Sequence, residues 1–286
     1  MSGVADAFRL PAALRLGAVT LQVADLARSI AYYTEVLGLR ELRRGEPGVE
    51  LGAAGRSEPL VVLRERVNAA RVPRGGLLGL YHYALLLPDR SALGRFLAHL
   101  RHRGVSAGAA DHLVSEALYL TDPDGLGIEV YADRPRAQWR TLQGELQMAT
   151  LALDADAVIA SAHGAVWDGM PAGACIGHVH LHVGNVQDGA RFYDDVLGFE
   201  PMVWSYPGAL FLAAGGYHHH LAINGWAGNA RAAAESDARL LEWRVVLRSP
   251  DDVERALGNV RRRGISTAAD GTVADPWGTV VRIVAG

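Results

Sequence analysis

Apolar residues recur along the chain in patterns that change from strand-like alternation to helical spacing and back. In residues 19–23 they alternate with polar residues, which is typical of a half-buried strand. Residues 25–37 then carry apolar side chains at helical spacing, with Asp25 as the candidate N-cap and Gly38 as the stop. Three short strand-like runs follow, at residues 40–42, 49–51 and 60–64. The first part of the chain therefore predicts a βαβββ unit.

The same order of elements begins again at residue 80. The turn sequence Asp122-Pro123-Asp124-Gly125 is a strong hairpin signal. Around it the pattern predicts a first strand, a helix that Gly104 ends, and two further strands, at residues 81–87, 90–103, 117–121 and 127–132. A second unit of the same kind thus follows the first.

The second half of the chain repeats the first half. Leu16 corresponds to Ile176 and Tyr33 to Tyr193, an offset of 160 residues in both cases, and the flanking residues match as well. We therefore expect an α+β fold of four βαβββ modules. One pair would occupy residues 1–133 and the other residues 175–286, with residues 134–174 as the connecting segment.

The repeat allows one position to be compared across the four modules. On the first strand the equivalent residues are Ala18, His82, His178 and Glu242. On the last strand, four residues after the turn glycine, they are Glu129 in module two and Arg282 in module four. Two imidazoles and one carboxylate form the facial arrangement that holds non-haem Fe(II) with open positions. The alternative is that these histidines are structural, as a lone histidine on a strand usually is. His180 and His182 point to the same face as His178 and remain alternative ligands or hydrogen-bonding partners.

Composition excludes several classes of function. The net charge is −3 and every basic residue is arginine, so the chain has no basic surplus for nucleic acid and no lysine for a Schiff base. Cys175 is the single cysteine, which excludes an internal disulfide and a cysteine-cluster metal site. No apolar run is long enough for a membrane span, and residues 1–16 lack the pattern of a secretory signal, so we expect a cytoplasmic protein.

The chain resembles the type I extradiol dioxygenases of the vicinal oxygen chelate superfamily, and in particular catechol 2,3-dioxygenase-like proteins. The resemblance covers nearly the whole chain outside the connecting segment. The stretches that carry it lie at residues 80–82, 111–119, 122–129, 177–182 and 217–220. It implies two half-barrels, each built from a pair of modules, a glyoxalase/bleomycin resistance fold that is shared by proteins of several functions.

The arrangement of ligands departs from the familiar extradiol enzymes. In those enzymes both ligand-bearing modules lie in the C-terminal half. Here the module with His82 and Glu129 is module two, and the module with His178 is module three. The metal site then requires that modules two and three pair with each other, and that modules one and four form the other pair.

The resemblance also implies roles for individual residues. His82, His178 and Glu129 would hold Fe(II), with Mn(II) as the alternative metal. His219 would be the acid–base residue, although the register leaves His218 and His220 as alternatives. His112 and Tyr119 match family residues that donate hydrogen bonds around the site. The aromatic residues that could line the pocket are Trp204, Tyr206, Trp226 and Trp243.

The expected reaction is cleavage of a small aromatic diol with O2 to a hydroxymuconic semialdehyde-type product. Partners would be the diol and O2, with neither nucleic acid nor membrane, and a homo-oligomer is compatible with the sequence. The runner-up is another metalloenzyme of the superfamily, which cleaves a hydroquinone or isomerises its substrate. A third interpretation is a metal-free protein that binds a small aromatic compound.

Overall fold

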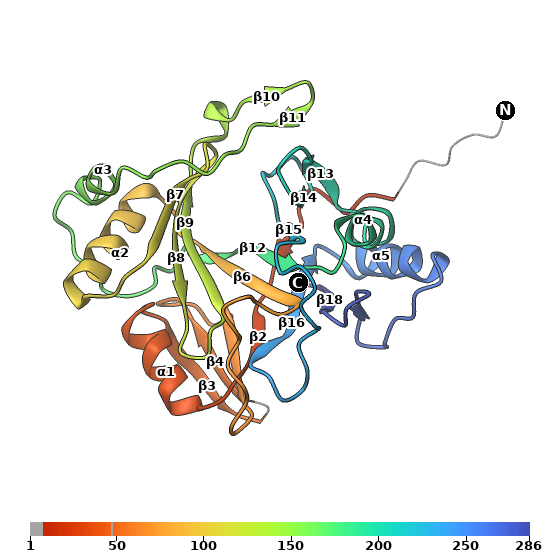
Figure 1. The fold of residues 1–286 in the computed structure, drawn as a ribbon, viewed down its shortest axis with the longest axis horizontal. Coiled ribbons are helices and arrows are strands. Elements are labelled where there is room, and N and C mark those ends of the chain that lie inside the picture. The colour runs from red at the N-terminus through yellow and green to blue at the C-terminus, as the bar shows by residue number, and fades with distance from the viewer. Residues whose placement is uncertain (1–7, 47) are drawn as a thin grey trace.

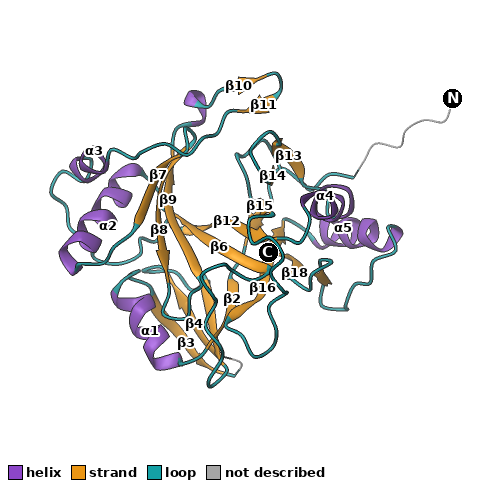
Figure 2. Ribbon diagram, viewed as in Figure 1, coloured by secondary structure: helices purple, strands orange, loops and turns teal. Residues whose placement is uncertain are grey.

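Two eight-stranded sheets form the centre of the molecule, and helices lie at its periphery (Figures 1 and 2). The structure is a computed structural model that describes residues 8–46 and 48–286. Residues 1–7 lie outside the described part of the chain, and they belong to the stretch 1–16 in which we expect no secretory signal. Among the described residues, none of the helices combines the length and the apolar character that a membrane span requires.

One sheet is built from modules two and three. Its strand order is β13-β14-β15-β12-β6-β9-β8-β7, with β6 and β12 antiparallel at the centre. Module two contributes β6 (Gly79–Leu86), β7 (Gly108–Asp111), β8 (Ser115–Thr121) and β9 (Gly127–Asp133). Module three contributes β12 (Cys175–His182), β13 (Glu200–Val203), β14 (Ala209–Ala213) and β15 (Leu221–Asn224).

The other sheet is built from modules one and four, in the order β17-β18-β16-β2-β5-β4-β3, with β1 paired to β16. Its N-terminal strands are β1 (Arg15–Leu16), β2 (Val19–Val23), β3 (Arg40–Gly45), β4 (Gly48–Gly52) and β5 (Val61–Glu65). Its C-terminal strands are β16 (Arg239–Leu247), β17 (Thr272–Ala274) and β18 (Val280–Ala285). The predicted pairing of modules is thereby confirmed, although module four has two strands after its helix rather than three.

The module helices begin at capping side chains, and the predicted N-cap Asp25 accepts from the backbone N–H of Arg28. Helix α2 (Arg90–Arg103) starts at Asp89 and ends at Gly104, whose φ of 68° is the left-handed conformation that glycine adopts readily. The other module helices are α1 (Leu26–Glu35), α4 (Val186–Ala190) with the π-helical turn η2 (Arg191–Val196), and α5 (Pro250–Arg262). The connecting segment contains η1 (Arg136–Gln138), the hairpin β10 (Thr141–Leu142) and β11 (Glu145–Leu146), and α3 (Ala155–Ala160).

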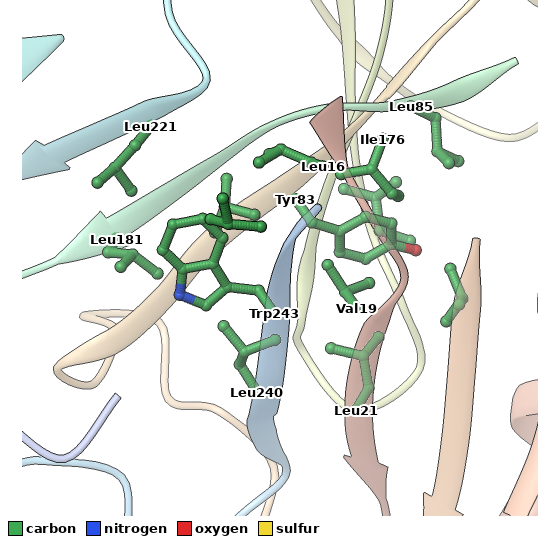
Figure 3. Close-up of a cluster of buried hydrophobic side chains, with 14 of the residues drawn as sticks. Leu16, Val19, Leu21, Tyr83, Leu85, Ile176, Leu181, Leu221, Leu240 and Trp243 are labelled. Atoms are coloured by element: carbon green, nitrogen blue, oxygen red, sulfur yellow. The ribbon is translucent and has the colours of Figure 1, made fainter. Parts of the chain in front are cut away.

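The main core lies between the central strands of the two sheets. Figure 3 shows Val19 and Leu21 of β2 and Trp243 of β16 facing Tyr83 of β6 and Leu181 of β12. Because strand side chains alternate between faces, the opposite face of β6 and β12 carries His82, His178 and their neighbours. The strands that form the core therefore also position the candidate ligands.

The aspartates that begin the two Asp-Pro turns tie neighbouring modules together. The Tyr33 hydroxyl donates to Asp122 at 3.2 Å, and the repeat-related Tyr193 donates to Asp275 at 2.9 Å. Asp122 also accepts from the backbone N–H groups of two residues in its own turn. Burial nevertheless raises the pKa of Asp122 to about 6.

Candidate metal centre and its cavity

Three candidate ligands from three strands surround the small side chain of Ala84. In the antiparallel pairing of β12 with β6, His178 lies opposite Ala84. In the parallel pairing of β6 with β9, Glu129 lies opposite Ala84 on its other side. His82 is two residues before Ala84 and therefore shares its face. The strand register alone thus brings His82, Glu129 and His178 together across the two halves of the chain.

The donor atoms of these residues converge on one point. His82 Nε2 lies 3.0 Å from Glu129 Oε2, His178 Nε2 lies 3.1 Å from the same oxygen, and the two nitrogens are 3.3 Å apart. Three ligands at right angles about a divalent ion, each at about 2.1 Å, would be separated from one another by about 3.0 Å. The spacing and the chemistry of these donors therefore fit a facial metal site.

The burial of the cluster supports the same interpretation. His82, Glu129 and His178 are all at most 5% exposed. Burial alone would raise the pKa of Glu129, but the interactions with His178 and His82 take it well below its usual range. Burial also lowers the pKa of His82, so its ring is neutral and able to bind a metal. A buried carboxylate that faces two imidazoles is costly to maintain unless a cation joins the group.

A cavity of about 260 Å³ opens in front of His82 and Glu129. This is just below the usual range for ligand pockets, roughly 300–1,000 Å³, so it suits a ligand about the size of a single ring. Much of its wall is aromatic or apolar, from Tyr81, Met148, Tyr206, Phe211 and Trp226. Two of the four predicted pocket aromatics, Tyr206 and Trp226, therefore lie where we expected.

The other two predicted pocket aromatics lie elsewhere. Trp243 is 1% exposed and packs in the core between the sheets, because it points to the opposite face of β16 from Glu242. Trp204 is 52% exposed on the loop after β13. Both expectations were wrong, since composition does not reveal which face of a strand or loop an aromatic side chain occupies.

The three consecutive histidines before β15 have different surroundings. His219 lines the cavity, and its ring centroid lies 4.1 Å from that of His178. His220 lines a separate cleft together with Cys175 and Gly177. His218 is fully buried, and its Nδ1 lies 2.7 Å from His219 Nδ1. Of the three, His219 is the one that the structure brings to the cavity.

His112 and Tyr119 form a hydrogen-bonded pair on the cavity wall. His112 Nδ1 lies 2.7 Å from the carbonyl oxygen of Ala149, which can only accept, so Nδ1 carries a proton. In the neutral ring His112 Nε2 is then an acceptor, and the Tyr119 hydroxyl donates to it at 2.6 Å. Burial and the nearby Glu129 carboxylate raise the pKa of Tyr119, which keeps its hydroxyl protonated.

His180 and His182 belong to a second hydrogen-bond group rather than to the three-donor cluster. His180 Nε2 accepts from the side-chain NH2 group of Asn224 at 2.8 Å. His182 Nδ1 donates to the side-chain oxygen Oδ1 of the same residue at 2.7 Å. His180 also lines the cavity. Sequence reasoning missed Asn224, although the parallel pairing of β12 and β15, which sets Asn224 beside His182, would have indicated it.

The equivalent positions in the other sheet carry an ion pair. Arg282 Nη2 lies 2.6 Å from Glu242 Oε2, and Arg244 Nε donates to Glu242 Oε1 at 2.8 Å. Ala18 occupies the position that corresponds to His178. The concave face of modules one and four therefore repeats the geometry of the site with a different chemistry.

Comparison with known proteins gives consistent results. A family model described as the Glyoxalase/Bleomycin resistance protein/Dioxygenase superfamily matches residues 15–130 and 175–282. The chain is 41% identical over 255 residues to a catechol-2,3-dioxygenase of Bacillus subtilis (strain 168), with 88% of this chain and 89% of the relative covered.

Solved structures support the fold. A candidate dioxygenase from Bacillus subtilis subsp. subtilis str. 168 superposes with a TM-score of 0.65 at 13% identity, covering 97% of this chain and 86% of the other. A glyoxalase I variant from Zea mays superposes with a TM-score of 0.57 at 18% identity, covering 95% and 94%. The expected vicinal oxygen chelate fold is confirmed, and the chain belongs to the glyoxalase/bleomycin resistance protein/dioxygenase superfamily.

Proposed function

We propose that this protein is a non-haem Fe(II)-dependent extradiol dioxygenase that opens the ring of a catechol-type aromatic with O2. The observation that carries the proposal is the convergence of the donor atoms of His82, His178 and Glu129, with His82 and Glu129 lining a small aromatic cavity. The product would be a ring-opened hydroxymuconic semialdehyde. The similarity to a catechol-2,3-dioxygenase over most of the chain supports this choice.

The protein's own residues divide the work between holding the metal and handling protons. His82, His178 and Glu129 would hold Fe(II), which supplies the exchange of electron density between the diol and O2 when it is bound. Because these three residues would be the protein donors, the ion they hold would remain able to take oxygen ligands from the cavity. The aromatic walls of the cavity would orient the ring and exclude water.

His219 is the proposed acid–base residue. It lines the cavity beside His178, and burial takes the pKa of its ring well below the usual value, so it begins neutral. Its Nε2 would accept a proton from a diol hydroxyl and return it to an oxygen atom of O2 as the O–O bond breaks, and both oxygen atoms remain in the ring-opened product. The Tyr119 hydroxyl donates to His112 Nε2 in this structure and would turn its proton to the negative charge that develops in the cavity.

The test is metal analysis of anaerobically purified protein followed by oxygen uptake with catechol. We expect one iron per chain and consumption of one O2 for each catechol, with a yellow ring-opened product. Metal without O2 uptake on catechol would overturn catechol cleavage in favour of hydroquinone cleavage or isomerisation. Tight binding of aromatic compounds without metal would favour a binding protein instead. Reconstitution with Mn(II) beside Fe(II) identifies the metal that supports turnover.

A further inference from the structure

A chain of hydrogen bonds leads from the cavity through the sheet to an aspartate near the surface. His219 Nδ1 lies 2.7 Å from His218 Nδ1, and His218 Nε2 lies 2.8 Å from Asp133 Oδ1. Asp133 ends β9, four residues after the candidate ligand Glu129. Neither Asp133 nor His218 touches the cavity, so neither is a candidate for contact with substrate.

The partners in this chain determine which ring nitrogens carry protons. The Asp133 carboxylate is an acceptor, so His218 Nε2 must donate to it. A neutral His218 ring then has an unprotonated Nδ1, which can only accept. The proton between the two rings must therefore belong to His219 Nδ1, and His219 Nε2 is left with its lone pair.

We propose that Asp133 and His218 are positioning residues that hold His219 in its Nδ1–H tautomer, so that the Nε2 lone pair is available to a ligand in the cavity. This inference rests on the proposed function for the use made of His219, but the tautomer itself can be measured independently. An acid–base histidine needs a second group to fix its tautomer and the orientation of its ring.

Packing keeps the His218 ring in the required orientation. Its centroid lies 4.1 Å from the Tyr217 ring and 5.3 Å from the Trp139 ring, and the side chain is fully buried. A flip of the ring would place carbon atoms against both Asp133 and His219, with the loss of two hydrogen bonds.

The opposite tautomer of His219 would require His218 to be a buried cation. Asp133 is 26% exposed and also accepts from the Tyr217 hydroxyl at 3.3 Å, so water and Tyr217 share its charge. That arrangement compensates poorly for the desolvation of a fully buried imidazolium.

Two substitutions at His218 separate the hydrogen bond from the packing. His218→Phe keeps the ring volume but removes the acceptor, whereas His218→Asn offers an amide oxygen close to the position of Nδ1. Asp133→Asn removes the charge but retains an acceptor for His218. His220→Phe is the matched control, because His220 is the next residue but one and faces a different cleft.

The first readout is the protonation of each imidazole nitrogen by ¹⁵N NMR of the full-length chain labelled in histidine, with and without Zn(II) as a diamagnetic ion. The His219 signals are assigned from their loss in His219→Gln. We expect a proton on Nδ1 and none on Nε2 in the wild type, in His220→Phe and in His218→Asn. In His218→Phe we expect that preference to be lost.

The second readout is steady-state kinetics with catechol. We expect His218→Phe to lower kcat about 10- to 100-fold, with KM and iron content unchanged, and His218→Asn to recover most of the loss. A proton on Nε2 in the wild type, or an unchanged tautomer in His218→Phe, would overturn the inference. If His218→Phe does not fold, the tautomer of His219 in the wild-type spectrum decides. A wild type that shows the expected tautomer but leaves catechol intact would refute the proposed function alone.

Discussion

Replacing His82 with alanine should abolish the stabilisation that a divalent metal gives to this fold. His82 is one of three donors around Ala84, and its Nε2 is 3.0 Å from Glu129 Oε2 and 3.3 Å from His178 Nε2. After the change, two donors remain, one from each half of the chain. A site of two ligands no longer encloses one face of an ion, so its affinity falls steeply.

The size of the effect follows from binding linkage. An ion present at 100 times its dissociation constant stabilises the folded chain by about 2.7 kcal/mol. Changes to residues that only support a metal ligand already cost about 10- to 100-fold in affinity, so loss of a ligand should remove nearly all of that stabilisation. At roughly 2–4 °C per kcal/mol for a domain of 150–250 residues, the wild type should show a metal-dependent rise in Tm of about 5–11 °C.

The measurement is thermal unfolding of each variant with EDTA and with anaerobic Fe(II), together with the metal content per chain. Glu242→Ala is the matched control, because Glu242 is the repeat-related residue of His82 and is equally part of a polar cluster. Both variants should have a lower Tm in EDTA than the wild type. Only His82→Ala should lose the rise with Fe(II). A full rise in His82→Ala, or none in the wild type, would refute the ligand assignment.

Three further changes test the surroundings of the site and the turns that tie the modules. Ala84→Leu should eliminate metal binding in a metal analysis, because the leucine side chain would extend among the three donors. Ala84→Gly should retain the metal and lower the unfolding free energy by about 1 kcal/mol, which thermal unfolding measures. A Cβ at Gly177 would lie 1.9 Å from the Tyr131 hydroxyl, so Gly177→Ala should displace β12 and weaken metal binding. The control is Gly17→Ala at the repeat-related position, where the added Cβ would lie 3.0 Å from Val246, and a metal titration should show unchanged affinity. The raised pKa of Asp122, about 6 against 3.8 for the free side chain, means that its contribution to stability is present below about pH 4 and is lost as the pH rises through 6. Between pH 4 and 7 the unfolding free energy of the wild type should therefore fall by about 3 kcal/mol because of Asp122, and Asp122→Asn should lack this fall. Denaturant titrations in which the unfolding free energy depends on pH equally in both proteins would contradict this.

The sequence predicts those features that depend on local pattern and on the repeat. Helix α2 has the predicted bounds, the repeat identified His82 and His178 as equivalent first-strand positions, and the spacing from the turn glycine identified Glu129 on the last strand of the His82 module. Alternation did not resolve the three histidines at residues 218–220, because they precede β15 and are not part of a regular strand. The contact of His218 with Asp133 joins residues 85 positions apart on different modules, and no local pattern indicates it.

The way the modules pair explains why the described part of this duplicated chain has a single candidate metal site. Because module two pairs with module three, one concave face receives all three donors, and the remaining modules receive Ala18, Glu242 and Arg282. In that second face Arg282 occupies the place of the carboxylate and Glu242 the place of a histidine, so the pair satisfies its own charge. In the first face, among the described residues, the Glu129 carboxylate has no arginine partner and contacts the rings of His82 and His178. Since β6 with β9 and β12 come from opposite halves, a cation bound there would also hold the two halves of the chain together, which is why metal binding and global stability should rise and fall together.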